Sequence, residues 1–274
     1  MSIIINNNPA SIAAQRNLSI NSSALQRSVE HLSSGLRITR AADDAAGLAV
    51  SSTLRAHIAS INQATRNAND GISLTQIADG AASTIGNLLS RLRELSSQSA
   101  SGTIGSTERS YLDQEFVSLR SEIDRIASVT EFNGTSLLSG ANNSFEVFVG
   151  FKSGANNSIT ANLKDLDVTS IGLNTVDIST AANAQSALSN IDSAISAVAT
   201  ARAGYGSIQN RFEAAISNLQ VTSENFTAAE SRIRDADVAY ETSQFTKNQV
   251  LVQAGISVLA QANALPQQAL ALLR

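Results

Sequence analysis

The stretch NQVLVQAGISVLAQANALPQQALALL, residues 248–273, contains no charged side chain, although it has the apolar spacing of a helix. Its apolar and small residues advance by alternating steps of three and four, the spacing of a coiled-coil seam: Leu251, Gly255, Val258, Ala262, Leu265, Ala269 and Leu272. A second apolar stripe repeats through Val238, Phe245, Val252, Leu259 and Leu273. Since a solvent-facing helix normally has a charged outer face, two apolar sides predict burial among several neighbouring helices.

The length of this uncharged stretch would also suit a membrane-spanning helix. Several amides interrupt it, however, and each would need a hydrogen-bond partner inside lipid: Asn248, Gln249, Gln253, Gln261, Asn263, Gln267 and Gln268. Pro266 also lacks a backbone donor near the end. We therefore predict no membrane insertion. Residues 1–15 likewise carry no charge until Arg16, and their short apolar run is not a cleavable secretory signal, so export would need another route.

Similar seams occur along both halves of the chain. Near the N-terminus, Leu18, Leu25 and Leu32 recur every seven residues, and further seams cover residues 54–95, 112–126 and 184–219. Helices of this kind are marginal in water without packing partners. We therefore expect the two chain ends to be disordered in the monomer and to fold on assembly.

The middle of the chain differs. Phe132-Asn133-Gly134 predicts a turn, because Asn and Gly tolerate positive φ. Phe145–Val149 and Ser158–Leu163 predict two strands of a hairpin, and the rest of residues 140–180 is polar and loop-rich. The fold class that follows is mainly α: an elongated antiparallel helical bundle or coiled coil with a small central β-hairpin, in which the N- and C-terminal helices pair.

Two charge clusters lie at matching distances from the chain ends. One comprises Arg37, Arg40, Asp43 and Asp44, and the other Arg232, Arg234, Asp235 and Asp237. Helices of similar rise leaving from paired termini would bring both clusters to one level. The alternative is two unrelated solvated groups, since exposed ion pairs contribute only about 0–1 kcal/mol.

Composition restricts the chemistry that the chain can perform. A formal net charge of −4 disfavours nucleic acid as a partner, and the absence of cysteine excludes disulfides and thiol chemistry. His31 and His57 are far apart in sequence and suit helix side chains better than metal ligands. No glycine-rich phosphate loop is present, and Asp43-Asp44 fits helix capping better than paired catalysis. We expect no enzymatic activity and no cofactor.

Several long segments, in the same order along the chain, resemble bacterial flagellin. In the first half these are Leu32–Ile38, Ala41–Ala49, Arg66–Ile72, Leu92–Leu95 and Glu131–Gly134. In the second half they are Gln209–Phe212, Glu224–Asp235, Phe245–Gln249 and Leu259–Asn263. The resemblance covers roughly residues 1–140 and 183–274, and the central segment is short for this family. Tyr205 departs from the aliphatic residue usual there.

The resemblance implies a secreted structural subunit that polymerises into the extracellular flagellar filament for swimming motility. It also implies four regions: an N-terminal inner-core helix at 1–42, outer-core helices with the hairpin at 43–182, an outer-core helix at 183–230 and a C-terminal inner-core helix at 231–274. The variable segment is about 140–180. Implied partners are other copies of the chain, the flagellar cap, junction proteins, the type III export apparatus and a flagellin chaperone.

Two sets of residues carry these expectations. We predict that polymerisation buries Leu18, Leu25, Leu32, Leu251, Val258, Leu265 and Leu272. By resemblance, Toll-like receptor 5 would contact Arg91, Leu95 and Glu115. The alternatives are a hook–filament junction protein, which shares the helical ends, and a surface adhesin derived from flagellin, which would need a ligand site in the small central segment.

Overall fold

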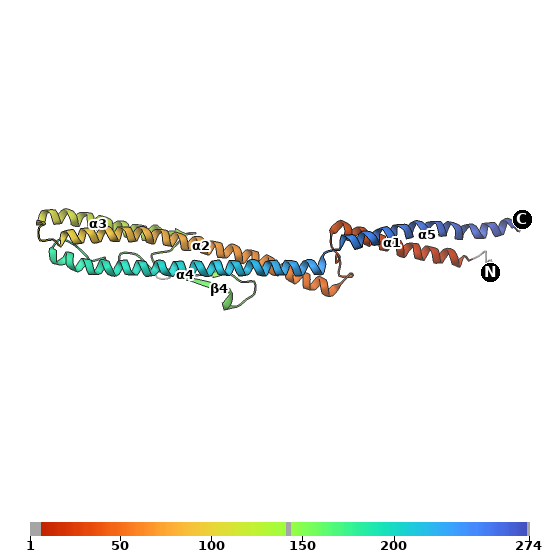
Figure 1. The fold of residues 1–274 in the computed structure, drawn as a ribbon, viewed down its shortest axis with the longest axis horizontal. Coiled ribbons are helices and arrows are strands. Elements are labelled where there is room, and N and C mark those ends of the chain that lie inside the picture. The colour runs from red at the N-terminus through yellow and green to blue at the C-terminus, as the bar shows by residue number, and fades with distance from the viewer. Residues whose placement is uncertain (1–6, 141–143, 273–274) are drawn as a thin grey trace. The chain divides into compact units, whose positions relative to one another are not determined.

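The computed structural model describes residues 7–140 and 144–272, which divide into two compact units (Figure 1). The terminal unit comprises Met1–Ala56 with Asn225–Arg274, and the central unit comprises His57–Glu224. The long helices α2 (Ala45–Ser99) and α4 (Ala181–Arg234) each contribute residues to both units. The mainly α fold class expected from the seams is confirmed.

The terminal unit is built on α1 (Pro9–Ser34) and α5 (Val238–Leu272), which lie side by side in Figure 1. The side chain of Asn8 caps α1 by accepting a hydrogen bond from the N–H of Ser11, at 3.1 Å. Gly35 ends α1 with φ of 71° and donates its N–H to the carbonyl of His31, at 2.8 Å. The predicted pairing of the N- and C-terminal helices is therefore confirmed, and it is antiparallel.

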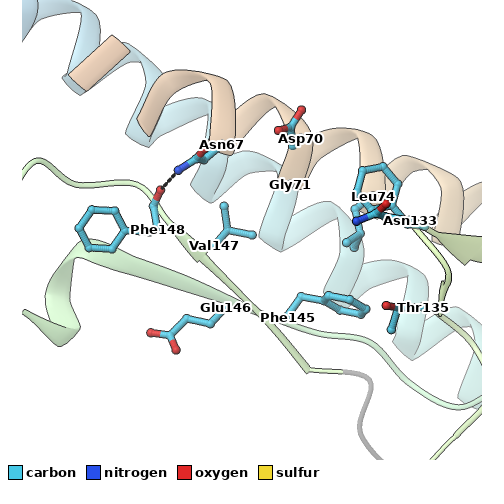
Figure 2. Close-up of a pocket in the computed structure, with 11 residues that line it drawn as sticks. Asn67, Asp70, Gly71, Leu74, Asn133, Thr135, Phe145, Glu146, Val147 and Phe148 are labelled. Atoms are coloured by element: carbon cyan, nitrogen blue, oxygen red, sulfur yellow. Dashed lines mark hydrogen bonds between the residues drawn. The ribbon is translucent and has the colours of Figure 1, made fainter. Parts of the chain in front are cut away.

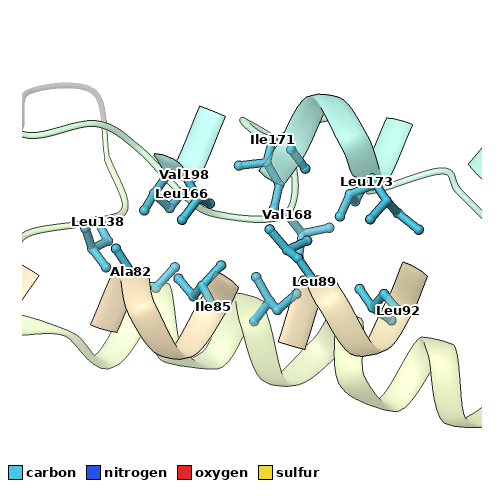
Figure 3. Close-up of a cluster of buried hydrophobic side chains, with 14 of the residues drawn as sticks. Ala82, Ile85, Leu89, Leu92, Leu138, Leu166, Val168, Ile171, Leu173 and Val198 are labelled. Atoms are coloured by element: carbon cyan, nitrogen blue, oxygen red, sulfur yellow. The ribbon is translucent and has the colours of Figure 1, made fainter. Parts of the chain in front are cut away.

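The central unit packs α2 and α4 against α3 (Ser106–Val129) around one large apolar core. Figure 3 shows Ala82, Ile85, Leu89 and Leu92 of α2 pointing toward Val198 of α4 and toward the loop before α4. These α2 residues recur at steps of three and four, so one stripe of the helix is buried along its length.

The segment before α4 contributes more to this core than its polar composition suggests. Its apolar residues are buried against the helices: Leu163, Leu166, Val168, Ile171, Leu173, Val176 and Ile178. Arg120 of α3 donates to the carbonyl of Val176 at 2.7 Å, and Asp113 accepts the N–H of Ile178 at 2.9 Å. The loop before α4 is therefore fixed against the helices of the central unit and covers part of their apolar core.

Two short antiparallel hairpins complete the central unit. β1 (Glu131–Phe132) and β2 (Thr135–Ser136) flank Asn133 and Gly134, whose φ values of 51° and 76° form the predicted turn. β3 (Ser144–Phe148) pairs with β4 (Ser158–Asn162), and a 3₁₀ turn, η1 (Ala155–Asn157), lies between them. The predicted hairpin is thus present, with strand bounds that differ by one residue.

A second, smaller apolar cluster lies where this hairpin covers the helices. Ile159 and Ala161 of β4 pack with Ala68 of α2 and Phe212 of α4. Gly71 of α2 is buried beside the same ring, and a Cβ at this position would lie 2.6 Å from Cζ of Phe212. The glycine therefore permits the close approach of the two helices.

Candidate assembly surface

One face of α5 packs on α1. Gly255 lies against Leu18, so that a Cβ at Gly255 would be 3.3 Å from Cδ1 of the leucine. Phe245, Val252 and Leu259, which recur every seven residues on this face, are half-buried. The contact with α1 therefore uses the second of the two apolar stripes together with Gly255 and Ala262, the small residues of the first seam.

Outside this contact, α5 exposes large apolar side chains. Val250 is 62% exposed, Ile256 55% and Val258 53%. On α1, Ile12 and Ile20 are also exposed. Isolated exposed apolar residues are ordinary, but a series of them along two paired helices marks a surface for a macromolecular partner. We define the outward faces as Ile12 and Ile20 of α1 together with Val250, Leu251, Ile256 and Val258 of α5.

The residues predicted to be buried by polymerisation fall into three groups. Leu18, Leu25 and Leu32 are half-buried in the α1–α5 pair. Leu251 and Val258 are exposed, so they remain available for another chain. The side chains of Leu265 and Leu272 lie outside the described part of the structure. Among the described residues of the first seam of α5, the small ones, Gly255 and Ala262, therefore lie toward α1, whereas the large ones, Leu251 and Val258, are exposed.

The two charge clusters are brought together, and the hydrogen bonds that link them are accepted by backbone carbonyls. Leu36 forms a β-bridge with Asp235, and the N–H of Arg37 donates to the carbonyl of Arg234 at 2.7 Å. The guanidinium of Arg37 donates to the carbonyl of Ile233 at 2.6 Å, and Nε of Arg234 donates to the carbonyl of Ile38 at 3.3 Å. Within residues 7–140 and 144–272, no ion pair joins an arginine of one cluster to an aspartate of the other.

The aspartates of the clusters organise helix starts and the linker. Asp44 accepts the N–H of Gly47 at 2.9 Å at the beginning of α2, and Asp237 accepts the N–H of Ala239 at 2.9 Å at the beginning of α5. Asp43 accepts the N–H groups of Thr39 and Arg40, at 3.1 and 3.0 Å. The backbone hydrogen bond from Arg40, followed by those from Thr39, lowers the pKa of the Asp43 carboxyl below its ordinary value.

The other cluster residues are placed at the surface of the linker. Arg40 pairs with Glu30, and this hydrogen-bonded partner lowers the pKa of the Glu30 carboxyl. His31 lies 3.5 Å from a carboxylate oxygen of Glu241 and 4.0 Å from one of Asp43. Arg232 is exposed.

The three residues expected to contact an innate receptor have different environments. Arg91 and Glu115 are exposed and joined by a hydrogen-bonded ion pair of 2.9 Å between α2 and α3. Leu95 is buried in the large core, with 1% of its surface exposed. The structure therefore presents the ion pair, and not the leucine, at the surface.

A pocket of about 450 Å³ lies between α2, the first hairpin and β3 (Figure 2). Leu74, Phe145 and Val147 give it apolar walls, while Asp70 and Glu146 add carboxylates. Asn67 donates to the carbonyl of Phe148 at 3.0 Å, as the dashed line shows. None of the groups that line it forms a nucleophile–base pair.

Metal binding and membrane insertion both make demands that can be compared with the described part of the chain. No group of three or more His, Asp or Glu side chains there could hold a metal ion. No helix in that part of the chain has the length and apolar character to cross a bilayer.

Sequence reasoning missed the polar contacts between the terminal helices. Asn8, Ser11 and Ser28 of α1 hydrogen-bond to Ala262, Asn263 and Asn248 of α5. From the sequence, the amides of α5 argue against a membrane-spanning helix, but they do not by themselves identify partners on α1. Their recurrence on a helix without charges was the signal that could have identified a polar pairing within the seam.

Comparison with known proteins connects this arrangement to a family. Residues 5–143 match the bacterial flagellin N-terminal helical region, and residues 188–273 match the bacterial flagellin C-terminal helical region. A flagellin of Halalkalibacterium halodurans is 45% identical over 99% of this chain and 100% of its own length. The flagellar filament 33 kDa core protein of Treponema phagedenis is 41% identical, with 99% and 100% covered. The crystal structure of Bacillus cereus flagellin superposes with a TM-score of 0.51 at 33% identity, covering 60% of this chain and 94% of that one.

Proposed function

The chain belongs to the bacterial flagellin family and is a structural subunit of the extracellular flagellar filament, and we propose that it polymerises by burying the outward faces of α1 and α5 against other copies of itself. The single observation that carries this proposal is the series of exposed apolar side chains on α5, within a stretch that has no charge between Lys247 and Arg274. Polymerisation would remove these side chains from water.

The energetics favour several neighbours over one. Full burial of a Val, Leu or Ile side chain stabilises by about 1.5–3 kcal/mol, and each outward residue would gain the exposed part of that amount. Because association and ordering cost several kcal/mol, one such residue is insufficient, whereas a full outward face on each of two helices provides a surplus. Removing one chain end should therefore abolish growth instead of slowing it.

The test introduces a charge on the outward face. Val258→Glu places a carboxylate where we propose that a neighbouring copy packs, and it should prevent filament growth while the helical content of the monomer is kept. Thr160→Glu, which adds the same charge at an exposed position of β4, is the matched control and should still polymerise. Electron microscopy of purified, salt-nucleated protein gives the readout. Normal filaments of the Val258→Glu variant would disprove the proposed contact.

We propose the four regions 1–42, 43–182, 183–230 and 231–274 as the inner- and outer-core parts of the subunit. The linker contacts support a first boundary after α1, whereas the last boundary, between residues 230 and 231, falls within the final turn of α4. The same outward faces would need shielding before assembly, which supports a flagellin chaperone as a partner. Export apparatus, cap and junction proteins remain proposals from family membership.

For innate recognition, we propose that Toll-like receptor 5 contacts the Arg91–Glu115 pair on the monomer. The exposure of this pair supports the proposal, whereas the buried Leu95 would contribute by packing α2 on α3. A receptor reporter assay should lose its response with Arg91→Ala and keep it with Arg125→Ala, an arginine in a similar surface pair on α3. A monomer without any response would remove this proposal.

We further propose that the chain has no enzymatic activity, which its membership of a family of structural proteins supports. The alternatives of a junction protein or an adhesin are disfavoured by the flagellin matches at both chain ends. Electron microscopy distinguishes the three, because only a filament subunit forms long tubes.

A further inference from the structure

The apolar seam between α1 and α5 is repetitive. Leu18, Leu25 and Leu32 recur every seven residues on α1, and Phe245, Val252 and Leu259 recur every seven on α5. If α5 slid along α1 by seven residues, a leucine would still oppose an apolar residue at most levels of the seam. Apolar packing alone therefore does not distinguish the observed alignment from one shifted by a heptad.

Polar contacts within the seam do distinguish them. Oγ of Ser11 lies 2.8 Å from Oδ1 of Asn263 and donates to it, and Nδ2 of Asn248 donates to Oγ of Ser28 at 3.4 Å. The two serines are 7% and 4% exposed, so their hydroxyls are largely removed from water. A buried hydroxyl without a partner is costly, which makes these contacts sensitive to alignment.

A shift by seven residues would break both contacts. When the helix moves in the direction that brings Gly255 opposite Leu25, Ser11 would face Leu270 in place of Asn263, and Ser28 would face Gly255 in place of Asn248. Leu18 would lose its opposing Gly255 and meet Ala262, whose Cβ would have to enter the space that the glycine leaves. The β-bridge of Leu36 with Asp235 fixes the two helices only at the linker, where α1 ends and α5 begins.

We propose that Ser11–Asn263 and Ser28–Asn248, together with Gly255, are positioning residues that fix the register of α1 against α5. The register decides which residues of the outward face of α1 lie beside which residues of the outward face of α5, and so the combined surface that a second copy meets. The importance for assembly rests on the proposed function, but the register itself is a property of one chain.

The absence of cysteine allows a direct test by engineered disulfides. In the pair Leu18→Cys/Gly255→Cys, the two Cβ atoms would lie 3.8 Å apart, inside the range of roughly 3.5–4.5 Å that a disulfide requires. The pair Leu25→Cys/Gly255→Cys reports the shifted register, because Leu25 is about 10 Å further along α1. Both reporters share the cysteine at 255 and differ only in register.

Oxidation traps the α1–α5 pair whenever the chain ends fold, even if they are largely disordered in the monomer, so dilute monomer should give the first disulfide and leave the second at background. With Ser11, Ser28, Asn248 and Asn263 all changed to alanine, the shifted disulfide should rise about thirtyfold, since each of the two lost buried hydrogen bonds changes an equilibrium by about fivefold. In the variant Ser28→Asn/Asn248→Ser, the polar pair is kept but the two residues exchange helices. The amount of the shifted disulfide should therefore return toward background.

Circular dichroism separates register from folding. If the fourfold alanine variant loses helical content, the two-residue variant Ser28→Ala/Asn248→Ala replaces it in the experiment. The shifted disulfide should then also increase, but by less. The proposal is overturned if helical variants without the polar pairs still form only the in-register disulfide, or if the swapped pair does not restore it. Failure of filament growth with an unchanged disulfide pattern would instead count against the proposed function.

Discussion

Replacing Gly71 by alanine should destabilise the central unit, although alanine is the better helix former. The new Cβ would lie 2.6, 2.9 and 3.0 Å from three ring atoms of Phe212, which is itself fully buried and cannot swing away freely. Overpacking of this kind costs about 1–3 kcal/mol. The gain in helix propensity returns about 1 kcal/mol, so we expect a net loss of up to about 2 kcal/mol.

Gly80 provides the matched control on the same helix. A Cβ at Gly80 would meet nothing within 4 Å, so Gly80→Ala should show the propensity gain alone and stabilise by about 1 kcal/mol. The difference between the two variants isolates the contact with Phe212, at about 1–3 kcal/mol. Urea unfolding followed by circular dichroism measures both variants against the unchanged chain.

A second substitution tests the assigned cause. Phe212→Leu shortens the side chain that meets the new methyl group, so Gly71→Ala should cost less in that background than in the unchanged chain, as coupled neighbours require. Equal stability of Gly71→Ala and Gly80→Ala, or additive effects of Gly71→Ala and Phe212→Leu, would refute the reasoning.

Three further outcomes follow from single side chains. Asp44→Ala should lower the free energy of unfolding by about 0.5–2 kcal/mol, because it removes the cap of α2, whereas an unchanged denaturation midpoint would exclude this role. Tyr205→Phe should cost about 0.5–1.5 kcal/mol, because the phenol accepts the N–H of Lys164 at 3.3 Å, and amide exchange at Lys164 should rise with it. The fold lowers the pKa of Asp43, so its carboxylate stabilises the terminal unit above the ordinary value of 3.8, and this stability disappears as pH falls through the lower folded pKa. Asp43→Asn should therefore weaken the loss of thermal stability below about pH 4, and an identical pH profile for both proteins would contradict this assignment.

Much of the secondary structure is readable from local sequence. The seams located the helices because a buried stripe must recur every three to four residues in any helix that packs on one side. Asn133-Gly134 located the first hairpin turn because its backbone needs positive φ at both positions. The covering loop before α4 escaped prediction, since its buried residues follow no helical or strand period and become apolar contacts only when the helices are in place.

The candidate site divides in the same way. The uncharged chain ends indicated an assembling surface, because the lack of charged residues can be read from the sequence without knowing the fold. Leu95 and Arg91 are one turn apart on α2, and the sequence could not show that one is buried while the other is exposed. The charge clusters suggested ion pairs, whereas the folded linker joins them by hydrogen bonds to backbone carbonyls, some from backbone N–H groups and two from the guanidinium groups of Arg37 and Arg234.

By itself the sequence determined that α5 has two apolar stripes, and that neither carries charge. Only the tertiary structure decided that Phe245, Val252 and Leu259 face α1 while Leu251 and Val258 remain exposed. The physical reason is that periodicity defines the spacing of a stripe but not the direction in which it points. That direction depends on contacts between residues far apart in the chain, such as Gly255 with Leu18 and Asn263 with Ser11.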